Sequence, residues 1–190
     1  MVRTAGGARL REISLHILDL VENSIRAGAA VVSVSLEEKP AEDSMTVCVE
    51  DDGPGLDVSD DVATDPFFTT KEGKRTGLGL SLFKFRAEQA GGSFHLGRSA
   101  LGGLSVSARM PLSSVDRSPL GDFAGTLASV VCTNPGVELR SCLRVADREW
   151  RVSTADITRS MPAGQRGEIS LARRMRDKIA EGLDALNVKG

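Results

Sequence analysis

The pattern of apolar and polar positions is most regular near the N-terminal end of the chain, over residues 13–29. Apolar side chains recur there at a helical spacing, and polar side chains recur at the same spacing on a second stripe. The apolar positions are Ile13, Ile17, Leu20, Val21 and Ile25, and the polar positions are Glu12, His16, Asp19, Asn23 and Arg26. This pattern predicts an amphipathic helix with one buried face. Asp19 and Asn23 are four residues apart and reach the same side of that helix, where they could hold water and a metal ion.

Alternating patterns downstream of this helix predict strands. Residues 31–36 and 45–50 alternate between apolar and polar side chains, as half-buried strands do. The charged loop between them is short and contains Pro40, so we expect the two strands to form an antiparallel pair. Residues 93–96 and 104–110 alternate in the same way and predict two more strands joined by a turn.

The segment between these strand pairs combines a long loop with a glycine-bearing helix start. Residues 57–76 show little periodicity, and a loop of this length inside a compact domain is either a lid or disordered. The sequence Thr76-Gly77-Leu78-Gly79 then opens a second helix, which is expected to end near Ala90. A glycine-bearing loop that leads into a helix presents free N–H groups to an anion.

The C-terminal part of the chain follows a stretch rich in proline and serine, which predicts a boundary. Beyond this boundary we expect a helix at 123–132, a hairpin formed by 137–145 and 149–153, and a last helix at 168–186. The last helix carries an apolar stripe that is expected to pack on its own hairpin, and a dimer or partner surface is the alternative. The residues of this stripe are Leu171, Met175, Ile179, Leu183 and Leu186.

These patterns divide the chain into three parts. We expect a domain over residues 1–112, a linker over 113–119, and a helix-hairpin-helix extension of unknown role over 120–190.

Composition narrows the class of protein. The chain of 190 residues is 41% hydrophobic and has a formal net charge of −2, which is ordinary for a globular protein. Neither half is basic, so no nucleic-acid partner is expected. The apolar runs are too short to span a membrane, and the first residues lack the apolar core of a signal peptide, so we expect a cytoplasmic protein. The three cysteines form no CxxC or Cys/His cluster and are expected to be free structural thiols.

An acidic and glycine-rich turn follows the second strand. Residues 51–55 read Asp-Asp-Gly-Pro-Gly, and the glycines would let the backbone approach a ligand closely. A plain β-turn explains the same residues. His16 lies on the same polar stripe as Asp19 and Asn23 and could reach a ligand bound at that end of the helix. We expect it instead to be partly exposed and without a role.

Four blocks, taken in this order, resemble the GHKL ATPase superfamily, which includes gyrase, heat-shock chaperones, sensor histidine kinases and mismatch-repair ATPases. Residues 19–29 resemble its N box, 51–56 its first glycine box, 66–71 with 77–80 the phenylalanine and second glycine boxes of sensor kinases, and 103–112 their closing strand. The resemblance covers roughly residues 8–112 and indicates a stand-alone form without a phosphoacceptor domain. It implies an α+β two-layer sandwich, the Bergerat ATP-binding fold, with a mixed sheet, helices on one face and a small α/β C-terminal extension.

The resemblance also implies roles for single residues. Asn23 would coordinate Mg²⁺, a hard cation suited to an amide oxygen. Asp51 would accept a hydrogen bond from the adenine amino group and so select ATP over GTP. The nucleotide would further be contacted by Gly53 and Gly55 beside the base, and by Lys71, Thr76, Gly77, Leu78 and Gly79 at the phosphates.

The expected function is Mg²⁺-dependent ATP binding with slow hydrolysis, in a regulatory switch that meets a protein partner through residues 120–190. Asp19 stands where family ATPases carry a glutamate, and it would act as the general base. The alternative function is a protein kinase, either of the anti-sigma-factor serine kinase type or an orphan histidine kinase module. In that case no residue of this chain activates water, and the γ-phosphate passes to a partner protein. A nucleotide-binding module without turnover is a third option, and a homodimer is left open.

Overall fold

A computed structural model of the chain describes residues 12–56 and 78–189. Its α-helices are α1 (Ile13–Arg26), α3 (Leu78–Gln89), α4 (Phe123–Thr133), α5 (Thr154–Ser160) and α6 (Glu168–Leu186). Its strands are β1 (Val31–Lys39), β2 (Ser44–Asp51), β3 (Ser93–Arg98), β4 (Leu104–Pro111), β5 (Glu138–Val145) and β6 (Arg148–Ser153). Two short 3-10 helices complete the description, η1 (Pro40–Glu42) and η2 (Ala163–Gln165).

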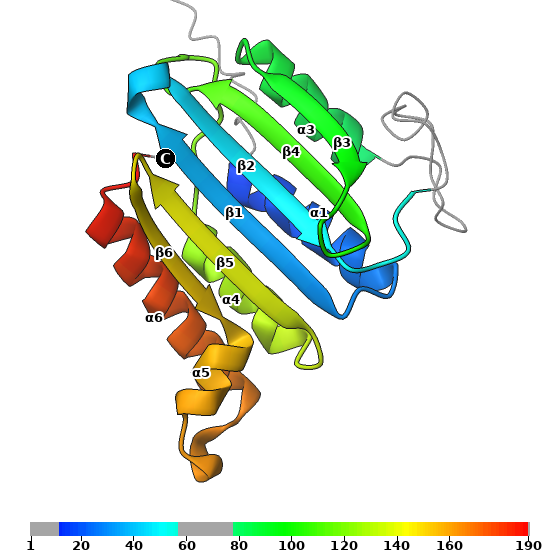
Figure 1. The fold of residues 1–190 in the computed structure, drawn as a ribbon, viewed down its shortest axis with the longest axis vertical. Helices are drawn as coiled ribbons and strands as arrows, with labels where there is room; N and C mark the ends of the chain where they lie inside the picture. Colours follow the sequence, from blue (N-terminus) through cyan, green and yellow to red (C-terminus); the bar gives the residue numbers. More distant parts are fainter. Residues whose placement is uncertain (1–11, 57–77, 190) are drawn as a thin grey trace, which may run out of the picture.

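The strands form a single mixed sheet in the order β3-β4-β2-β1-β5-β6 (Figure 1). Neighbouring strands are antiparallel, as predicted for β1 with β2, except that β5 runs parallel to β1. The C-terminal hairpin β5–β6 therefore extends the sheet formed by the N-terminal strands. Its register sets Val34 of β1 between Val49 of β2 and Ser141 of β5.

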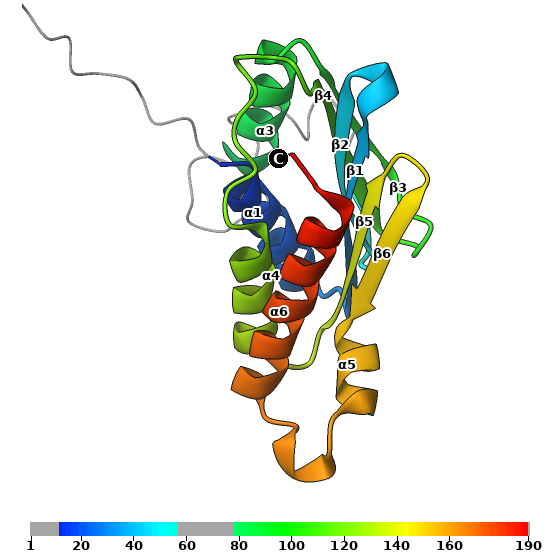
Figure 2. The same cartoon turned by 90° about the vertical axis from the view of Figure 1, so that its left-hand side faces the viewer.

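Helices α1, α3, α4 and α6 lie on one face of the sheet, which makes the two-layer α+β fold expected from the sequence (Figure 2). The period of two along each strand explains the layering, because alternate side chains point to opposite faces. In β1, Val32, Val34 and Leu36 are buried toward the helices, whereas Ser33 and Ser35 lie on the other face.

The core is continuous between the N-terminal and C-terminal parts. Helix α1 buries its apolar face as predicted, with Ile17 and Val21 fully inaccessible to solvent. Helix α4 packs against both α1 and α6, so a single apolar cluster extends from one part to the other. Met175 and Ile179 of α6 are fully buried, and α6 packs on β5, β6 and α4. The prediction that the apolar stripe of α6 packs on its own hairpin is confirmed, and α4 is an additional partner.

The segment that joins the two parts contacts α1. The backbone carbonyls of Pro119 and Leu120 accept hydrogen bonds from the N–H groups of Ile13 and Ser14, each at 2.9 Å. Two of the donors that every helix leaves unpaired in its first turn are satisfied in this way. The division of the chain at residues 113–119 stays a prediction.

One expectation is wrong. His16 is not partly exposed, because α3 crosses α1 at its level; it is 1% exposed and stacks on Phe83 at a centroid distance of 5.2 Å. The three cysteines are free thiols, as expected. The predicted lid lies outside the described residues. None of the described helices has the length and apolar character needed to cross a bilayer.

Candidate functional site

Asp51 is the last residue of β2, and its carboxylate lies on the helix side of the sheet with 5% of the residue exposed. One carboxylate oxygen accepts a hydrogen bond from the Ser24 hydroxyl of α1 at 2.5 Å. The other accepts from the backbone N–H groups of Gly53 at 3.0 Å and Leu104 at 3.1 Å. A carboxylate offers about four acceptor positions, so these three donors leave capacity for one donor on a ligand.

Glycines allow the backbone to close around this carboxylate. A Cβ atom on Gly103 would collide with Asp51 Oδ1 and with the backbone of Gly53, so no side chain fits there. The Gly103 N–H group donates to the backbone carbonyl of Asp51 at 3.0 Å. Gly55 has a φ of +78°, a backbone conformation that favours glycine. The turn after β2 and the start of β4 thus form a narrow cradle whose inner wall is backbone.

The polar stripe of α1 faces the first turn of α3. A Cβ atom built on Gly79 would lie 3.7 Å from both Asn23 Nδ2 and Asp19 Cβ. The structure therefore brings Asp19, Asn23 and Gly79 together, three residues that the sequence assigned to one site. Leu78 begins α3, whereas Lys71, Thr76 and Gly77 lie outside the described residues.

Asn23 is engaged by a neighbouring cation. Its amide oxygen accepts a hydrogen bond from Arg26 Nη1 at 2.9 Å, and the Arg26 guanidinium lies 3.8 Å from a carboxylate oxygen of Glu22. An amide oxygen has a second lone pair, so it can ligate a metal ion beside this bond or after losing it. In the described part of the chain, no three His, Cys, Asp or Glu side chains gather into a metal cluster.

Asp52 has a structural task rather than a ligand-facing one. Its Oδ1 atom accepts hydrogen bonds from the N–H groups of Ala30 and Val31, both at 2.8 Å. The bond from Val31 is the largest of the effects that hold the pKa of the Asp52 carboxyl below its ordinary value. Of the two adjacent acids in the predicted turn, Asp51 thus faces the cradle and Asp52 ties the start of β1 to the end of β2.

Sequence reasoning missed three contributors to the site: Ser24, Arg26 and Gly103. Ser24 is a small polar residue with 7% exposure on the buried side of α1, directly after Asn23. That position was the available signal, because a serine among buried helix positions needs a hydrogen-bond partner. Arg26 was recognised on the polar stripe without a role. Nothing local in the sequence connects Gly103 to Asp51.

Comparison with known proteins identifies the family. Residues 9–114 match the family described as histidine kinase-, DNA gyrase B- and HSP90-like ATPase. The chain belongs to this family. The match supports ATP binding, and it covers α1, β2, the start of α3 and β4, which carry the described site residues.

Two solved structures are similar to parts of this family member. One is the ATP-binding domain of PrrB from Mycobacterium tuberculosis, with a TM-score of 0.38, 25% identity, and coverage of 52% of this chain and 66% of that one. The other is the N-terminal domain of a DNA repair protein, with a TM-score of 0.46, 12% identity, and coverage of 74% of this chain and 51% of that one. This chain thus spans about two thirds of the first structure and about half of the second. No curated protein matches it.

Proposed function

We propose that this GHKL-family protein binds ATP with Mg²⁺ and hydrolyses it slowly, and that it acts as a regulatory switch. The observation that carries the proposal is the Asp51 carboxylate, which is buried, held by three protein donors and able to accept one more hydrogen bond. The adenine amino group is a donor of this kind. Guanine has a carbonyl oxygen at the same ring position, which a carboxylate repels.

Ser24 acts as a positioning residue in this proposal. Its hydroxyl donates to the oxygen of Asp51 that Gly53 and Leu104 leave free, so the carboxylate is fixed from both sides. All three protein partners donate to the carboxylate, and its remaining acceptor position can receive the amino group of the base.

The phosphate end of the proposed site lies between α1 and α3. The first N–H groups of a helix attract anions, and Gly79 brings the start of α3 close to Asp19 and Asn23. Arg26 adds a permanent positive charge beside Asn23, which is complementary to phosphate. Mg²⁺, when bound, would supply further charge to the phosphate oxygens, with Asn23 as its protein ligand. The proposed phosphate contacts of Lys71, Thr76, Gly77 and Leu78 rest on the sequence alone.

Asp19 is the proposed general base, since it lies one helical turn before Asn23 and faces the start of α3. Its carboxylate would accept a proton from the attacking water. Aspartate is one methylene shorter than the glutamate of family ATPases, which fits slow turnover.

Incubation with γ-labelled ATP and Mg²⁺ tests this assignment. We expect free labelled phosphate, released at a rate that Asp19→Asn abolishes. Glu22→Gln is the matched control, because Glu22 is also a carboxylate of α1 and pairs with Arg26 at the surface, so turnover should persist. Label that moves to a second protein would support the kinase alternative, and ATP binding with neither product would leave a binding module.

The regulatory part of the proposal rests on contacts to α1. Helix α4 packs on α1, α6 packs on α4, and the carbonyls of Pro119 and Leu120 bind the first turn of α1. We therefore expect ATP with Mg²⁺ to slow deuterium exchange in α4 and α6 as well as in α1. Exchange that changes in α1 alone would contradict a switch that reaches the partner-binding residues 120–190. A cytoplasmic location and a homodimer stay predictions from the sequence.

A further inference from the structure

The elements α5, η2 and the start of α6 form one end of the molecule (Figure 1), and the sequence of this segment is rich in arginine. Residues 159–176 contain five arginines and one glutamate, a net charge of +4, although the whole chain carries −2. The arginine patch, as we name it, consists of Arg159, Arg166, Arg173, Arg174 and Arg176 together with Ile169, and all six residues are exposed. No lysine contributes to it.

Carboxylates compensate part of the charge of the patch. Arg159 pairs with Asp156 at 3.0 Å, and Arg176 pairs with Asp177 at 3.3 Å. In the patch, Arg166 donates to the backbone carbonyl of Met161 at 3.0 Å, and Arg174 donates to the Gln165 amide oxygen at 3.3 Å. These acceptors are neutral, so these hydrogen bonds do not neutralise the positive charges of the two guanidinium groups.

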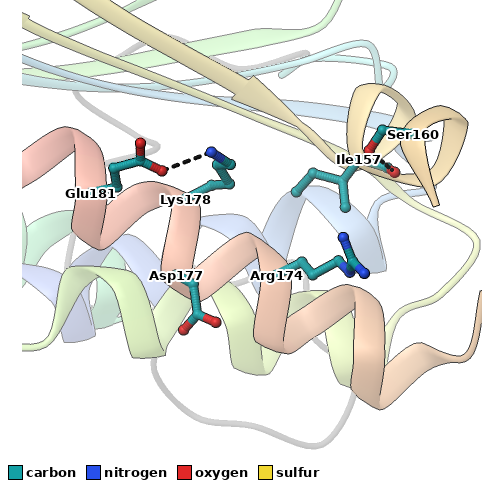
Figure 3. A pocket seen from close by; sticks show the side chains of 6 residues that line it. All are labelled: Ile157, Ser160, Arg174, Asp177, Lys178 and Glu181. Atoms are coloured by element: carbon teal, nitrogen blue, oxygen red, sulfur yellow. Dashed lines mark hydrogen bonds and ion pairs between the residues drawn. The ribbon is translucent and has the colours of Figure 1, made fainter. Parts of the chain in front are cut away.

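A pocket between α5 and α6 opens beside the patch and has a volume of about 130 Å³. Its lining residues are Ile157, Ser160, Arg174, Asp177, Lys178 and Glu181 (Figure 3). Lys178 and Glu181 neutralise each other at 2.7 Å, and the Asp177 carboxylate pairs with Arg176 at 3.3 Å. Arg174 is therefore the lining charge that remains for a ligand, and the volume suits one carboxylate side chain.

The patch also carries an exposed apolar side chain, Ile169, which is 70% exposed. Protein interfaces commonly combine an apolar centre with arginine, whose planar guanidinium binds carboxylates through two hydrogen bonds. Nucleic acid fits this surface poorly, because Glu168 and Asp177 interrupt the basic residues, residues 159–176 contain no aromatic side chain for base stacking, and the chain is acidic overall.

We propose that the arginine patch docks an acidic segment of a partner protein that carries one apolar side chain among its carboxylates. The apolar side chain covers Ile169, Arg173 and Arg174 bind carboxylates, and one carboxylate enters the pocket between α5 and α6. This inference deepens the proposed partner role of residues 120–190 by assigning the surface and the chemistry of what it binds.

The test uses the full chain and a short fluorescein-labelled peptide of glutamates around one central leucine, with binding followed by fluorescence anisotropy. Arg174→Glu should weaken binding by about tenfold or more, since it reverses the charge at the pocket. Ile169→Ser should weaken binding several-fold, and so should replacement of the peptide leucine by serine. The matched control is Arg109→Glu, an exposed arginine of β4 with the same change in net charge, which should leave affinity nearly unchanged.

Three results would overturn the proposal: equal losses in Arg174→Glu and Arg109→Glu, tighter binding of a DNA oligonucleotide of equal charge, or no peptide binding up to about 1 mM. ATP binding measured on the same variants separates this inference from the proposed function. Arg174→Glu should keep ATP affinity, whereas Asp51→Asn should lose ATP and still bind the peptide.

Discussion

The covered face of the sheet holds a buried carboxylate at each of two opposite ends, and the two are used differently. Asp51 ends β2 with 5% exposure, and Glu38 lies near the end of β1 with 1% exposure. Their register sets them far apart, because Asp51 pairs with Val32 and Glu38 with Met45. Both carboxylates accept backbone N–H groups.

The two carboxylates differ in their hydrogen-bond partners and in the acceptor capacity that these partners leave. Asp51 lies in a cradle of glycine backbone and keeps acceptor capacity for a ligand. Glu38 receives the N–H group of Lys189 on both oxygens, at 3.0 and 3.2 Å, and so fastens the chain that follows α6. Nearby, Arg148 donates to the carbonyls of Ala185 and Leu186 at 3.0 and 2.8 Å. Burial of a carboxylate alone therefore does not indicate a ligand site. The backbone groups around the carboxylate determine whether it can still accept a hydrogen bond from a ligand.

The largest expected effect is that of removing residues 113–190. This truncation deletes α4, β5, β6, α5 and α6 together with Lys189, the residue that Glu38 binds. Strand β1 would lose β5, and α1 would lose α4 and the carbonyls of Pro119 and Leu120. We expect residues 1–112 alone to show no cooperative unfolding transition in circular dichroism. A truncated chain that folds and binds ATP would show instead that the C-terminal part is a separable extension.

Asp51→Asn should abolish measurable ATP binding in calorimetry while the protein remains folded. Asparagine replaces one carboxylate oxygen by an amino group, which would face either the Ser24 hydroxyl or the N–H groups of Gly53 and Leu104. A single oxygen then remains to accept from the other donors and the base. An unsatisfied buried polar group costs about 1–3 kcal/mol, so unfolding should shift as well. Unchanged ATP affinity would contradict the adenine contact.

Glu38→Gln sharpens the comparison from the other end. It should lower the free energy of unfolding by about 1–3 kcal/mol, because glutamine has one acceptor oxygen for the Lys189 N–H group. ATP affinity should stay within about twofold. Glu37→Gln is the control, since Glu37 lies on the opposite face of β1 and pairs with Arg144 at the surface. A loss of ATP binding in Glu38→Gln would contradict the purely structural role of Glu38 and show that both ends of the sheet affect ATP binding.

The smallest expected effect concerns Asp52, whose pKa is lowered by hydrogen bonds from backbone N–H groups, chiefly that of Val31. A lowered pKa in the folded state stabilises the protein above the ordinary carboxyl value of about 4, and this stabilisation is lost as pH falls through the lowered value. Urea unfolding of Asp52→Asn should therefore differ from wild type at pH 7 and converge with it in strong acid. Asp147→Asn, in the exposed β5–β6 turn, is the control. A constant difference at all pH values would contradict the charge effect.

Much of the candidate site could be predicted because its residues carry local signals. Asp19 and Asn23 share a helical stripe, and Asp51 to Gly55 form an acidic turn at a strand end. Helix and strand periods depend on residues that are close in the sequence, so they can be recognised without knowing the fold. Lys71, Thr76 and Gly77 stay predictions of this kind.

The partners of these residues could not be predicted in the same way. Ser24 and Asp51 are 27 residues apart, and Leu104 follows Asp51 by 53, yet all three meet at one carboxylate. Glu38 and Lys189 are separated by 151 residues. No period in the sequence connects such positions.

The sequence by itself predicted the longer helices and the strands, which side of each is apolar, and the candidate site residues, but it did not predict α5. Only the tertiary structure decided that β5 lies parallel beside β1 and that Ser24 and Gly103 shape the cradle of Asp51. The physical reason is that patterning is set by neighbours along the chain, whereas strand order and burial depend on contacts between distant segments that form together.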